Sequence, residues 1–528
     1  MQTVIGRPSS SELRAPAGVS RLPFSQPALM CGTNTLPVAP GKCMLRGMLP
    51  KHLDQDDFSQ KSQLGLKLRF GIRSAKRLIL RILTSLLLPL SALSQVAEVD
   101  LRVSFFHIDA TPPIGSPLAY NRCDGVGMPL SARGVVLHGG GQPIVLCAVD
   151  WIGISNEGHK RWKQTLARAV GTVPEKVSVH TLHQHDAPRC DLSAEQLLQE
   201  RGLEGMLLDP EFVEQTLKRV GAAAQSAMET LLVVTHLGLG EAEVHQVAST
   251  RRILGPDGMV RATRFTACKD PLLRAEPEGV IDPKVKSLSF WNNDTLLIVL
   301  TWYATHPQSY YLTGRAHPDF PGMARGLREA TLNGVPHIHF NGAGGDIGAG
   351  KYNDGSPENR QQLAIRLADG MSRALVASER LPISRETLLW ETAAVRLPIA
   401  FHLSAASLRT QLEDSSRDPA TMIGIAEDLA WAERCEKGES MDLHCLSLGK
   451  ARLLFMPGEC SVAYQLAAQR MRPDQFVTMA AYGDYAPGYI CTEAQYAQGG
   501  YEASPRASRV APQVEGVLME AMRQLLDR

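Results

Sequence analysis

The sequence predicts an α/β fold in which a single large domain combines a mixed β-sheet with flanking helices. Two observations carry this prediction. From residue 101 onward, short apolar runs alternate with segments of helical periodicity, which is the pattern of α/β proteins. No Pro/Gly-rich stretch interrupts this alternation, so we expect no linker that divides it into separate domains.

The strands are expected where β-branched and apolar residues cluster, and the helices where apolar residues recur at helical spacing. Asp209-Pro210 and Asp319 are typical helix starts. The expected strands lie at residues 101–109, 134–137, 143–149, 176–183, 232–237, 295–305, 336–340, 443–448, 451–455 and 476–481. The expected helices lie at residues 156–170, 210–228, 319–333, 356–378, 419–437 and 514–526. No internal repeat is visible along the chain.

The charge of the chain is nearly balanced. The 55 Lys and Arg residues face 54 Asp and Glu residues, and the basic ones do not gather into a stripe with aromatic residues between them. We therefore expect no nucleic-acid partner.

The first 94 residues differ from the rest in composition. We expect residues 1–66 to be a disordered leader or a mis-annotated stretch, with translation beginning at Met48 or later. Residues 67–94 read as a signal peptide, because a basic segment precedes an apolar run that is shorter than the ~20 residues of a membrane span. An uncleaved membrane anchor is the alternative.

A secreted or periplasmic location follows from the signal peptide, and residues 95–528 would then form the functional domain. Eight of the ten cysteines lie after the signal, an even number in a compartment that permits disulfides. They form disulfides whose pairing the sequence does not reveal, or they are buried thiols.

One strand ends in a pair of histidines. The run at residues 176–183 leads into Leu182-His183-Gln184-His185-Asp186, and side chains two apart on a strand face the same side. That arrangement suits a metal ligand, His183, beside a second polar histidine, His185. A histidine-rich surface loop is the alternative interpretation.

Other strand ends carry further candidate ligands. His306 follows the strand at residues 295–305, Glu459 follows residues 451–455, and a tyrosine-rich segment follows residues 476–481. Two imidazoles and one carboxylate form a zinc set of the catalytic kind, which leaves a coordination position for water. A histidine that is simply a satisfied core group is the alternative at each position.

Two loops add candidate groups. Arg251 and Arg252 are adjacent, and such a pair is either solvated or a clamp for a carboxylate, a phosphate or a developing oxyanion. The glycine-rich loop at residues 341–350 lacks the spacing of a nucleotide-binding fingerprint. We interpret it as backbone that lies close to a substrate or metal.

Six segments of the chain occur in the order seen in one known family. These are HIDATPPIG, LHQHDAP, TWYATHP, FNGAGGDIG, MPGE and YGDYAPGYICTEAQYAQGGYEAS. Together they resemble the catalytic domain of the neutral, non-lysosomal ceramidases, over roughly residues 100–510. The resemblance identifies the chain as a divergent member of that family.

The resemblance implies a role for each matching residue. The family's four zinc ligands correspond to His183, His306, Glu459 and Tyr489. The catalytic positions correspond to His185, next to the scissile amide, to Tyr501, which lines the active site, and to Arg251.

Three departures from the family stand out. The asparagine of the arginine motif is missing, because Thr250 precedes Arg251. Gly342 stands where true ceramidases have a serine with a catalytic role. The family members with proven lipid activity continue into an immunoglobulin-like domain, whereas this sequence ends at Arg528. These departures concern the substrate and leave the metal ligands intact.

The resemblance therefore implies a secreted zinc-dependent amidohydrolase for an N-acyl amide such as a ceramide-like lipid, with contact to a membrane surface. Zinc lowers the pKa of a bound water from about 15.7 to about 7, which provides a nucleophile without a serine. His185 would transfer the proton, and Tyr501 and Arg251 would stabilise the oxyanion. The alternatives are a zinc hydrolase of another ester or amide, and a non-catalytic zinc-containing binding protein.

Overall fold

The computed structural model describes residues 100–527. The leader expected at residues 1–66 and the signal peptide expected at residues 67–94 lie outside the described residues. Within the described part, no helix is both long and apolar enough to cross a membrane. The eight cysteines that the structure describes are all free thiols.

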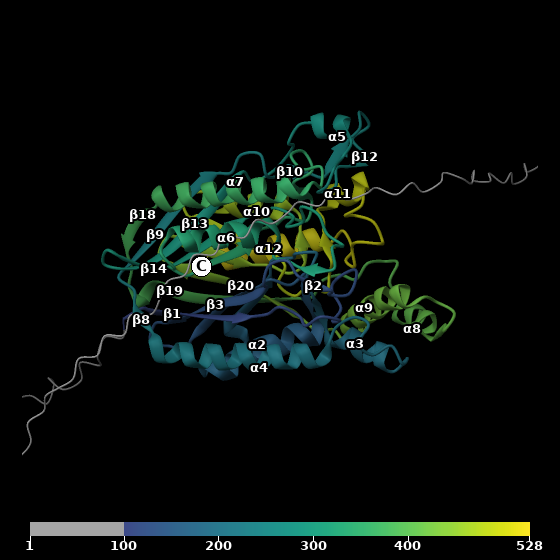
Figure 1. The fold of residues 1–528 in the computed structure, drawn as a ribbon, viewed down its shortest axis with the longest axis horizontal. Helices are drawn as coiled ribbons and strands as arrows, with labels where there is room; N and C mark the ends of the chain where they lie inside the picture. Colours follow the sequence, from purple (N-terminus) through teal and green to yellow (C-terminus); the bar gives the residue numbers. More distant parts are fainter. Residues whose placement is uncertain (1–99, 528) are drawn as a thin grey trace, which may run out of the picture. The chain divides into compact units, whose positions relative to one another are not determined.

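Three β-sheets of four or five strands organise the described part of the chain (Figure 1). The first has the order β6 (Val177–Thr181), β4 (Ile144–Val149), β3 (Ser131–His138), β1 (Arg102–Asp109) and β8 (Leu232–Val233). The second has the order β16 (His337–Asn341), β14 (Thr295–Tyr303), β13 (Lys284–Asn292), β9 (His236–Glu243) and β18 (Glu379–Pro382). The third has the order β19 (Leu388–Val395), β20 (Met441–Leu448), β21 (Ala451–Phe455) and β23 (Phe476–Ala480).

All three sheets repeat one topology. Three antiparallel strands are followed by a helix and then by a fourth strand that pairs parallel with the third. The helices in these crossovers are α2 (Asn156–Val170), α6 (Asp319–Thr331) and α10 (Val462–Met471). This repeat has no counterpart in the sequence pattern, because different apolar residues satisfy the same alternation of buried and exposed positions.

Helices cover the sheets on their outer sides, while the sheets share an apolar core. α4 (Pro210–Ala227) contacts β1, α7 (Pro357–Val376) contacts β9 and β13, and α12 (Val514–Leu526) contacts β19. Figure 1 shows α2 and α4 together on one side and α7 on the opposite side. Val135, Leu300 and Leu453, one from each sheet, are fully buried in the same apolar cluster. The core therefore holds the three sheets at fixed positions relative to one another.

Short elements fill the connections. The short strands are β2 (Gly125–Val126), β5 (Gly153–Ser155), β7 (Arg189–Asp191), β10 (Ser249–Thr250), β11 (Arg252–Leu254), β12 (Val260–Thr263), β15 (Arg315–Ala316), β17 (Ile347–Gly348), β22 (Glu459–Cys460) and β24 (Tyr489–Ile490). The remaining helices are α3 (Leu192–Gln199), α5 (Pro271–Ala275), α8 (Ala405–Glu413), α9 (Pro419–Glu436) and α11 (Glu493–Gln498), with 3-10 turns at Pro174–Lys176, Met228–Thr230 and Arg385–Thr387.

The prediction of a mixed α/β fold is confirmed, with two corrections. The β-structure forms several sheets, and β13 and β19 were not among the expected strands. The strand expected at residues 176–183 ends at Thr181, because His183 has a φ of 65°, in the left-handed region that ends an extended strand. His183 and His185 therefore lie on the loop that follows β6, and this loop turns both rings toward the same centre.

Candidate metal centre

The ends of three strands, one from each sheet, deliver the predicted ligands to one buried place. His183 and His185 follow β6, His306 follows β14, and Glu459 follows β21. Each of these strands runs parallel to a neighbour in its sheet. Because loops at the ends of such strands rest on a rigid scaffold, polar groups there can be held in fixed positions.

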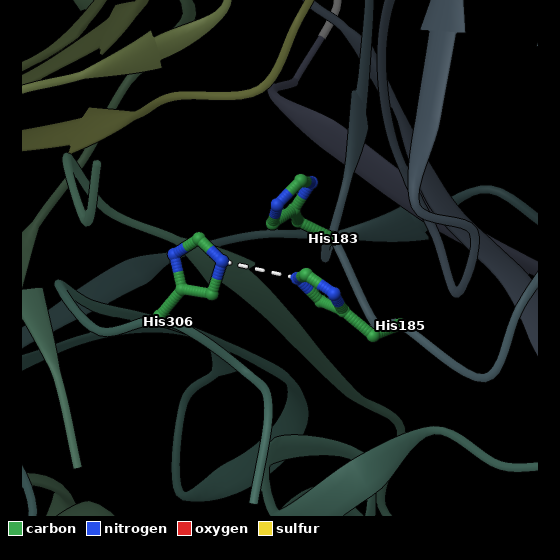
Figure 2. A group of neighbouring side chains, drawn as sticks. All are labelled: His183, His185 and His306. Atoms are coloured by element: carbon green, nitrogen blue, oxygen red, sulfur yellow. Dashed lines mark hydrogen bonds between the residues drawn. The ribbon is translucent and has the colours of Figure 1, made fainter. Parts of the chain in front are cut away.

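The three histidines form a compact cluster (Figure 2). Each can offer one ring nitrogen so that the three nitrogens lie within 4.8 Å of one another. The Nε2 atoms of His185 and His306 are 3.0 Å apart. All three imidazoles are buried. Burial, and after it the positive charge of Arg251, lowers the pKa of His306 well below its usual value, so this ring is neutral and able to bind a metal.

Glu459 completes the cluster. Its Oε2 lies 3.3 Å from Nε2 of His183 and 3.8 Å from Nδ1 of His306. Two ligand atoms on a tetrahedral zinc are separated by about 3.3 Å, given bonds of about 2.0–2.1 Å. The spacing of these three atoms therefore fits a shared metal ion.

The bonding state of the same atoms provides an independent test. The Oε2 of Glu459 and the Nδ1 of His306 are both buried and have no hydrogen-bond partner. Buried polar atoms are almost always satisfied, and an orphaned carboxylate oxygen is costly. These two atoms face each other across 3.8 Å, so a cation bound between them would satisfy both. The residues present therefore fit a zinc ion.

Neighbouring groups hold two of these ligands in place. The Nδ1 of His183 is 2.7 Å from the carbonyl oxygen of Ile152, and the hydroxyl of Tyr485 donates to Oε1 of Glu459 at 2.6 Å. The ring of His183 also stacks on that of Tyr482, with the centroids 4.7 Å apart. Such partners orient metal ligands and increase their affinity.

The fourth predicted ligand, Tyr489, lies beside the cluster. β22 and β24 pair in parallel with Glu459 directly opposite Tyr489, and the phenol ring lies parallel to the His306 ring at 6.4 Å. Its hydroxyl oxygen accepts a hydrogen bond from Nη1 of Arg251 at 3.0 Å. Burial raises the pKa of the Tyr489 phenol well above its usual value, and the Arg251 guanidinium opposes that rise.

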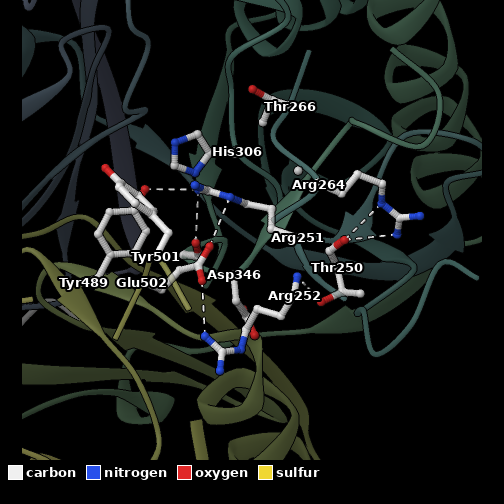
Figure 3. A network of polar contacts seen from close by, with 12 residues as sticks. Thr250, Arg251, Arg252, Arg264, Thr266, His306, Asp346, Tyr489, Tyr501 and Glu502 are labelled. Atoms are coloured by element: carbon white, nitrogen blue, oxygen red, sulfur yellow. Dashed lines mark hydrogen bonds and ion pairs between the residues drawn. The ribbon is translucent and has the colours of Figure 1, made fainter. Parts of the chain in front are cut away.

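Arg251 and Tyr501 lie beside Tyr489, with the Arg251 guanidinium next to His306 (Figure 3). The Arg251 guanidinium pairs with Glu502 at 3.3 Å and lies 5.4 Å from the centre of the Tyr501 ring. Tyr501 in turn meets Tyr489 edge to face at 5.6 Å. All seven predicted site residues are thus linked by direct contacts.

The site also contains residues that the sequence reasoning did not assign. They are Tyr482 and Tyr485, which pack on His183, Glu502, which pairs with both Arg251 and Arg252, and Gln308, which contacts His185. The tyrosines and Glu502 lie in the tyrosine-rich segment, and Gln308 is two residues after His306. Their proximity in sequence to the predicted ligands was the only available signal.

The glycine-rich loop lies close to the ligands, as the sequence predicted. A Cβ atom at Gly345 would collide with the backbone of Glu459. At Gly342, where the ceramidase family has its serine, a Cβ atom would lie 2.6 Å from Oε1 of Gln465 and 3.0 Å from the backbone of Ala304. A side chain at residue 342 would therefore require the side chain of Gln465 to move.

Comparison with known proteins gives a likeness in structure only. No family model and no curated protein sequence matches the chain. The fold is similar to that of neutral ceramidase from Pseudomonas aeruginosa, with a TM-score of 0.60 and 17% identity over 81% of this chain and 75% of that chain. A structure of a ceramidase complexed with C2 gives a TM-score of 0.58 and 15% identity, with the same coverage. The resemblance to neutral ceramidases that the motifs predicted is confirmed for the fold.

Proposed function

We propose that this protein is a zinc-dependent hydrolase that cleaves an N-acyl amide of the ceramide type. One observation carries the proposal: nitrogen and carboxylate atoms of His183, His306 and Glu459 face a common centre. Two of these atoms, Oε2 of Glu459 and Nδ1 of His306, have no hydrogen-bond partner. The likeness to the ceramidase fold supports the choice of an amide as the bond that is cleaved.

His183, His306, Glu459 and Tyr489 would hold the ion. Two imidazoles and one carboxylate are typical of catalytic zinc sites, in which one coordination position stays open. When bound there, zinc would supply a water molecule that is nucleophilic near neutral pH. Tyr485 fixes the carboxylate of Glu459 in its orientation.

The catalytic roles fall to residues around these ligands. His185 lies in contact with His306 and would move a proton from the attacking water to the leaving amine. Tyr501 is half-buried and would donate its hydroxyl to the oxyanion. The Arg251 guanidinium contributes a positive charge beside both tyrosines, Tyr489 and Tyr501.

The surroundings of His185 support an apolar substrate. The Tyr120 ring stacks on His185 at 5.6 Å and the Tyr311 ring meets it at 5.3 Å, and both tyrosines are substantially exposed. Leu312 beside them is also exposed. A substrate that approaches His185 would thus meet apolar surface, which favours a lipid and contact with a membrane or micelle. An export signal at residues 67–94 is part of the same proposal.

A hydrolase for another ester or amide is the second candidate. The close contacts at Gly342 favour it, because a serine there would displace the side chain of Gln465. A non-catalytic protein that binds zinc is the third candidate.

Purified protein, a panel of substrates and one histidine variant separate these candidates. The wild type should contain zinc and cleave N-acyl amides faster than matched esters, and chelation should remove activity. His185→Ala should retain zinc and lose activity by about 10²–10⁴-fold, since general acid–base catalysis contributes that much. The exposed His402→Ala serves as the control. A wild type that contains zinc but cleaves neither class would refute the proposed function.

A further inference from the structure

The adjacent residues Arg251 and Arg252 share one buried carboxylate, that of Glu502. Figure 3 shows the Glu502 carboxylate between the two guanidinium groups. Nε of Arg251 lies 3.3 Å from Oε1, and Nη1 of Arg252 lies 3.2 Å from Oε2. The exposed fractions of Arg251, Arg252 and Glu502 are only 3%, 6% and 1%. The arginine pair is therefore a clamp for a carboxylate that the protein itself supplies.

The two arginines hold this carboxylate differently. Arg252 donates a hydrogen bond to Oε2 of Glu502. Nε of Arg251 and Oε1 of Glu502 face each other, but neither atom has a hydrogen-bond partner. Arg251 instead donates from Nη1 to the hydroxyl of Tyr489 at 3.0 Å. Arg251 is thus attracted to Glu502 by charge alone, while its side-chain hydrogen bond is made to Tyr489, beside the metal ligands.

Arg252 is anchored on its other side by α11 and the turn that follows this helix. Its Nη2 donates to the carbonyl oxygens of Gln495 and Gly499, both at 2.9 Å. Several acceptors around one planar guanidinium fix its orientation. Arg252 therefore holds Glu502 in one position. In that position the carboxylate does not form the two parallel hydrogen bonds to Arg251 that arginine–carboxylate pairs favour.

The charges of this cluster have a consequence for the site. Two guanidinium groups around one carboxylate leave a positive charge in excess beside Tyr489 and Tyr501. Without Arg252, Glu502 would cancel the charge of Arg251 and would be free to turn toward it. Buried charges interact strongly, because little water screens them. A neutralised Arg251 would stabilise a developing oxyanion less.

We propose that Arg252 is a positioning residue that holds and neutralises Glu502, which leaves the hydrogen bond and the positive charge of Arg251 available to the site. The two adjacent arginines then have different roles, since Arg251 contacts the site tyrosines and Arg252 contacts α11. The inference rests on the proposed function for the oxyanion that Arg251 would stabilise, whereas the pairing of Glu502 is a property of the chain itself.

The first test reads this pairing without metal or turnover. In a crystal structure of metal-free Arg252→Met, we expect both oxygens of Glu502 to pair with Arg251, whose Nη1 should leave the hydroxyl of Tyr489. In the double variant Arg252→Met/Glu502→Gln, the hydrogen bond from Arg251 to Tyr489 should return. An Arg251 that keeps this hydrogen bond and stays apart from Glu502 in Arg252→Met would overturn the proposal.

The second test asks whether removing the negative charge restores activity. Arg252→Met should lower kcat by about 10–100-fold, somewhat less than the loss of an oxyanion donor, and change KM little. Arg252→Met/Glu502→Gln should recover most of this loss. Arg409→Met, which affects an exposed pair with Glu433, is the control and should leave kcat unchanged. A double variant as slow as Arg252→Met would overturn the proposal, because the loss would then come from the missing contacts to α11.

A further variant covers the case in which Arg252→Met does not fold. Arg252→Lys keeps the positive charge but loses the planar group that contacts α11. It should retain most of kcat and the hydrogen bond from Arg251 to Tyr489, and a folded Arg252→Lys that loses both would overturn the proposal.

The structural test also separates this inference from the proposed function. An inactive wild type, together with a Glu502 that turns to Arg251 in Arg252→Met, would refute the hydrolase and leave the inference intact. An active wild type whose Arg251 does not respond to Arg252→Met would do the reverse.

Discussion

Two buried polar clusters lie at strand ends in the described part of this molecule, and they differ in whether both oxygens of the central carboxylate are hydrogen-bonded. Asp150, after β4, accepts hydrogen bonds from Arg325, Ser131 and Gln184 on its two carboxylate oxygens. Glu459, after β21, accepts only from Tyr485, and its Oε2 has no partner. Both carboxylates follow the third strand of the same repeated unit.

This difference separates a structural cluster from a binding cluster. Both carboxylate oxygens of Asp150 are hydrogen-bonded within the protein, so this carboxylate stabilises the packing of α6 on the first sheet, although Oε1 of Gln184 and Nε of Arg325 beside it have no partner. In the Glu459 cluster, Oε2 of Glu459 and Nδ1 of His306 have no hydrogen-bond partner, which lowers the stability of the fold. A ligand that binds these atoms would restore that stability. The contrast predicts opposite effects when each carboxylate is replaced by its amide.

The largest expected effect is on the Glu459 cluster. In Glu459→Gln, we expect zinc to be lost from the purified protein and activity to fall by about a thousandfold or more, since the metal contributes several kcal/mol to catalysis. Metal-free Glu459→Gln should be at least as stable as metal-free wild type, because the new amide can donate to Nε2 of His183, 3.3 Å away. Metal analysis, kinetics and urea denaturation test both expectations. A large loss of metal-free stability would mean that the cluster is structural.

Replacing the carboxylate of the Asp150 cluster should change stability in the opposite sense. Asp150→Asn breaks a buried pair with Arg325 and should destabilise the fold by about 3–5 kcal/mol, as measured by urea denaturation. Asp294→Asn, which affects an exposed pair with Arg380, should cost at most about 1 kcal/mol. A small effect at Asp150 would remove the basis of the comparison.

The effect at Asp150 should also depend on pH. Burial by itself raises the pKa of the Asp150 carboxyl, but the charge and hydrogen bonds of Arg325 outweigh burial and hold that pKa below its usual value. The pair therefore stabilises the fold above the unfolded-state pKa of about 3.9, and this stability is lost as the pH falls through the lower folded-state pKa. The difference in unfolding free energy between wild type and Asp150→Asn should shrink on acidification. A difference that grows at low pH would contradict this explanation.

A smaller effect is expected at Gly342, in the glycine-rich loop beside the Glu459 cluster. Gly342→Ser restores the residue of the ceramidase motif, yet its Cβ would lie 2.6 Å from Oε1 of Gln465. We expect a destabilisation of about 1–3 kcal/mol, typical of overpacking, and no gain in activity toward ceramide. Gly424→Ser in α9, where nothing lies within 4 Å of the new Cβ, is the control. A clear gain in ceramide hydrolysis would show that only the serine was missing.

The smallest effect concerns the one hydrogen bond of Glu459. Tyr485→Phe removes the donor to Oε1, and we expect zinc affinity to fall about tenfold, the lower range for a residue that orients a ligand. Tyr352→Phe breaks another tyrosine–glutamate hydrogen bond, that with Glu278, and should leave zinc affinity unchanged. Competition with a fluorescent chelator measures both. Equal affinity in wild type and Tyr485→Phe would mean that Glu459 is held by its backbone alone.

Much of the fold could be predicted because the relevant signals are local. The apolar run of β14 and the capping Asp209 of α4 each act on residues within a few positions, so their effect is visible in sequence. β19 was not predicted because most of its side chains, including that of Trp390, are partly exposed. Its polar and apolar residues do not alternate regularly. The end of β6 was placed too late, since nothing in the local sequence marks the left-handed φ of 65° at His183.

The sequence by itself determined which residue types stand at the strand ends, and through its motifs it indicated that His183, His306 and Glu459 act together. Only the tertiary structure decided what each group can do. The groups that satisfy Asp150 and that leave Oε2 of Glu459 without a partner come from distant parts of the chain, as with Arg325, which is 175 residues from Asp150. Local sequence specifies the backbone, whereas hydrogen-bond direction depends on groups that meet only when the three sheets pack together.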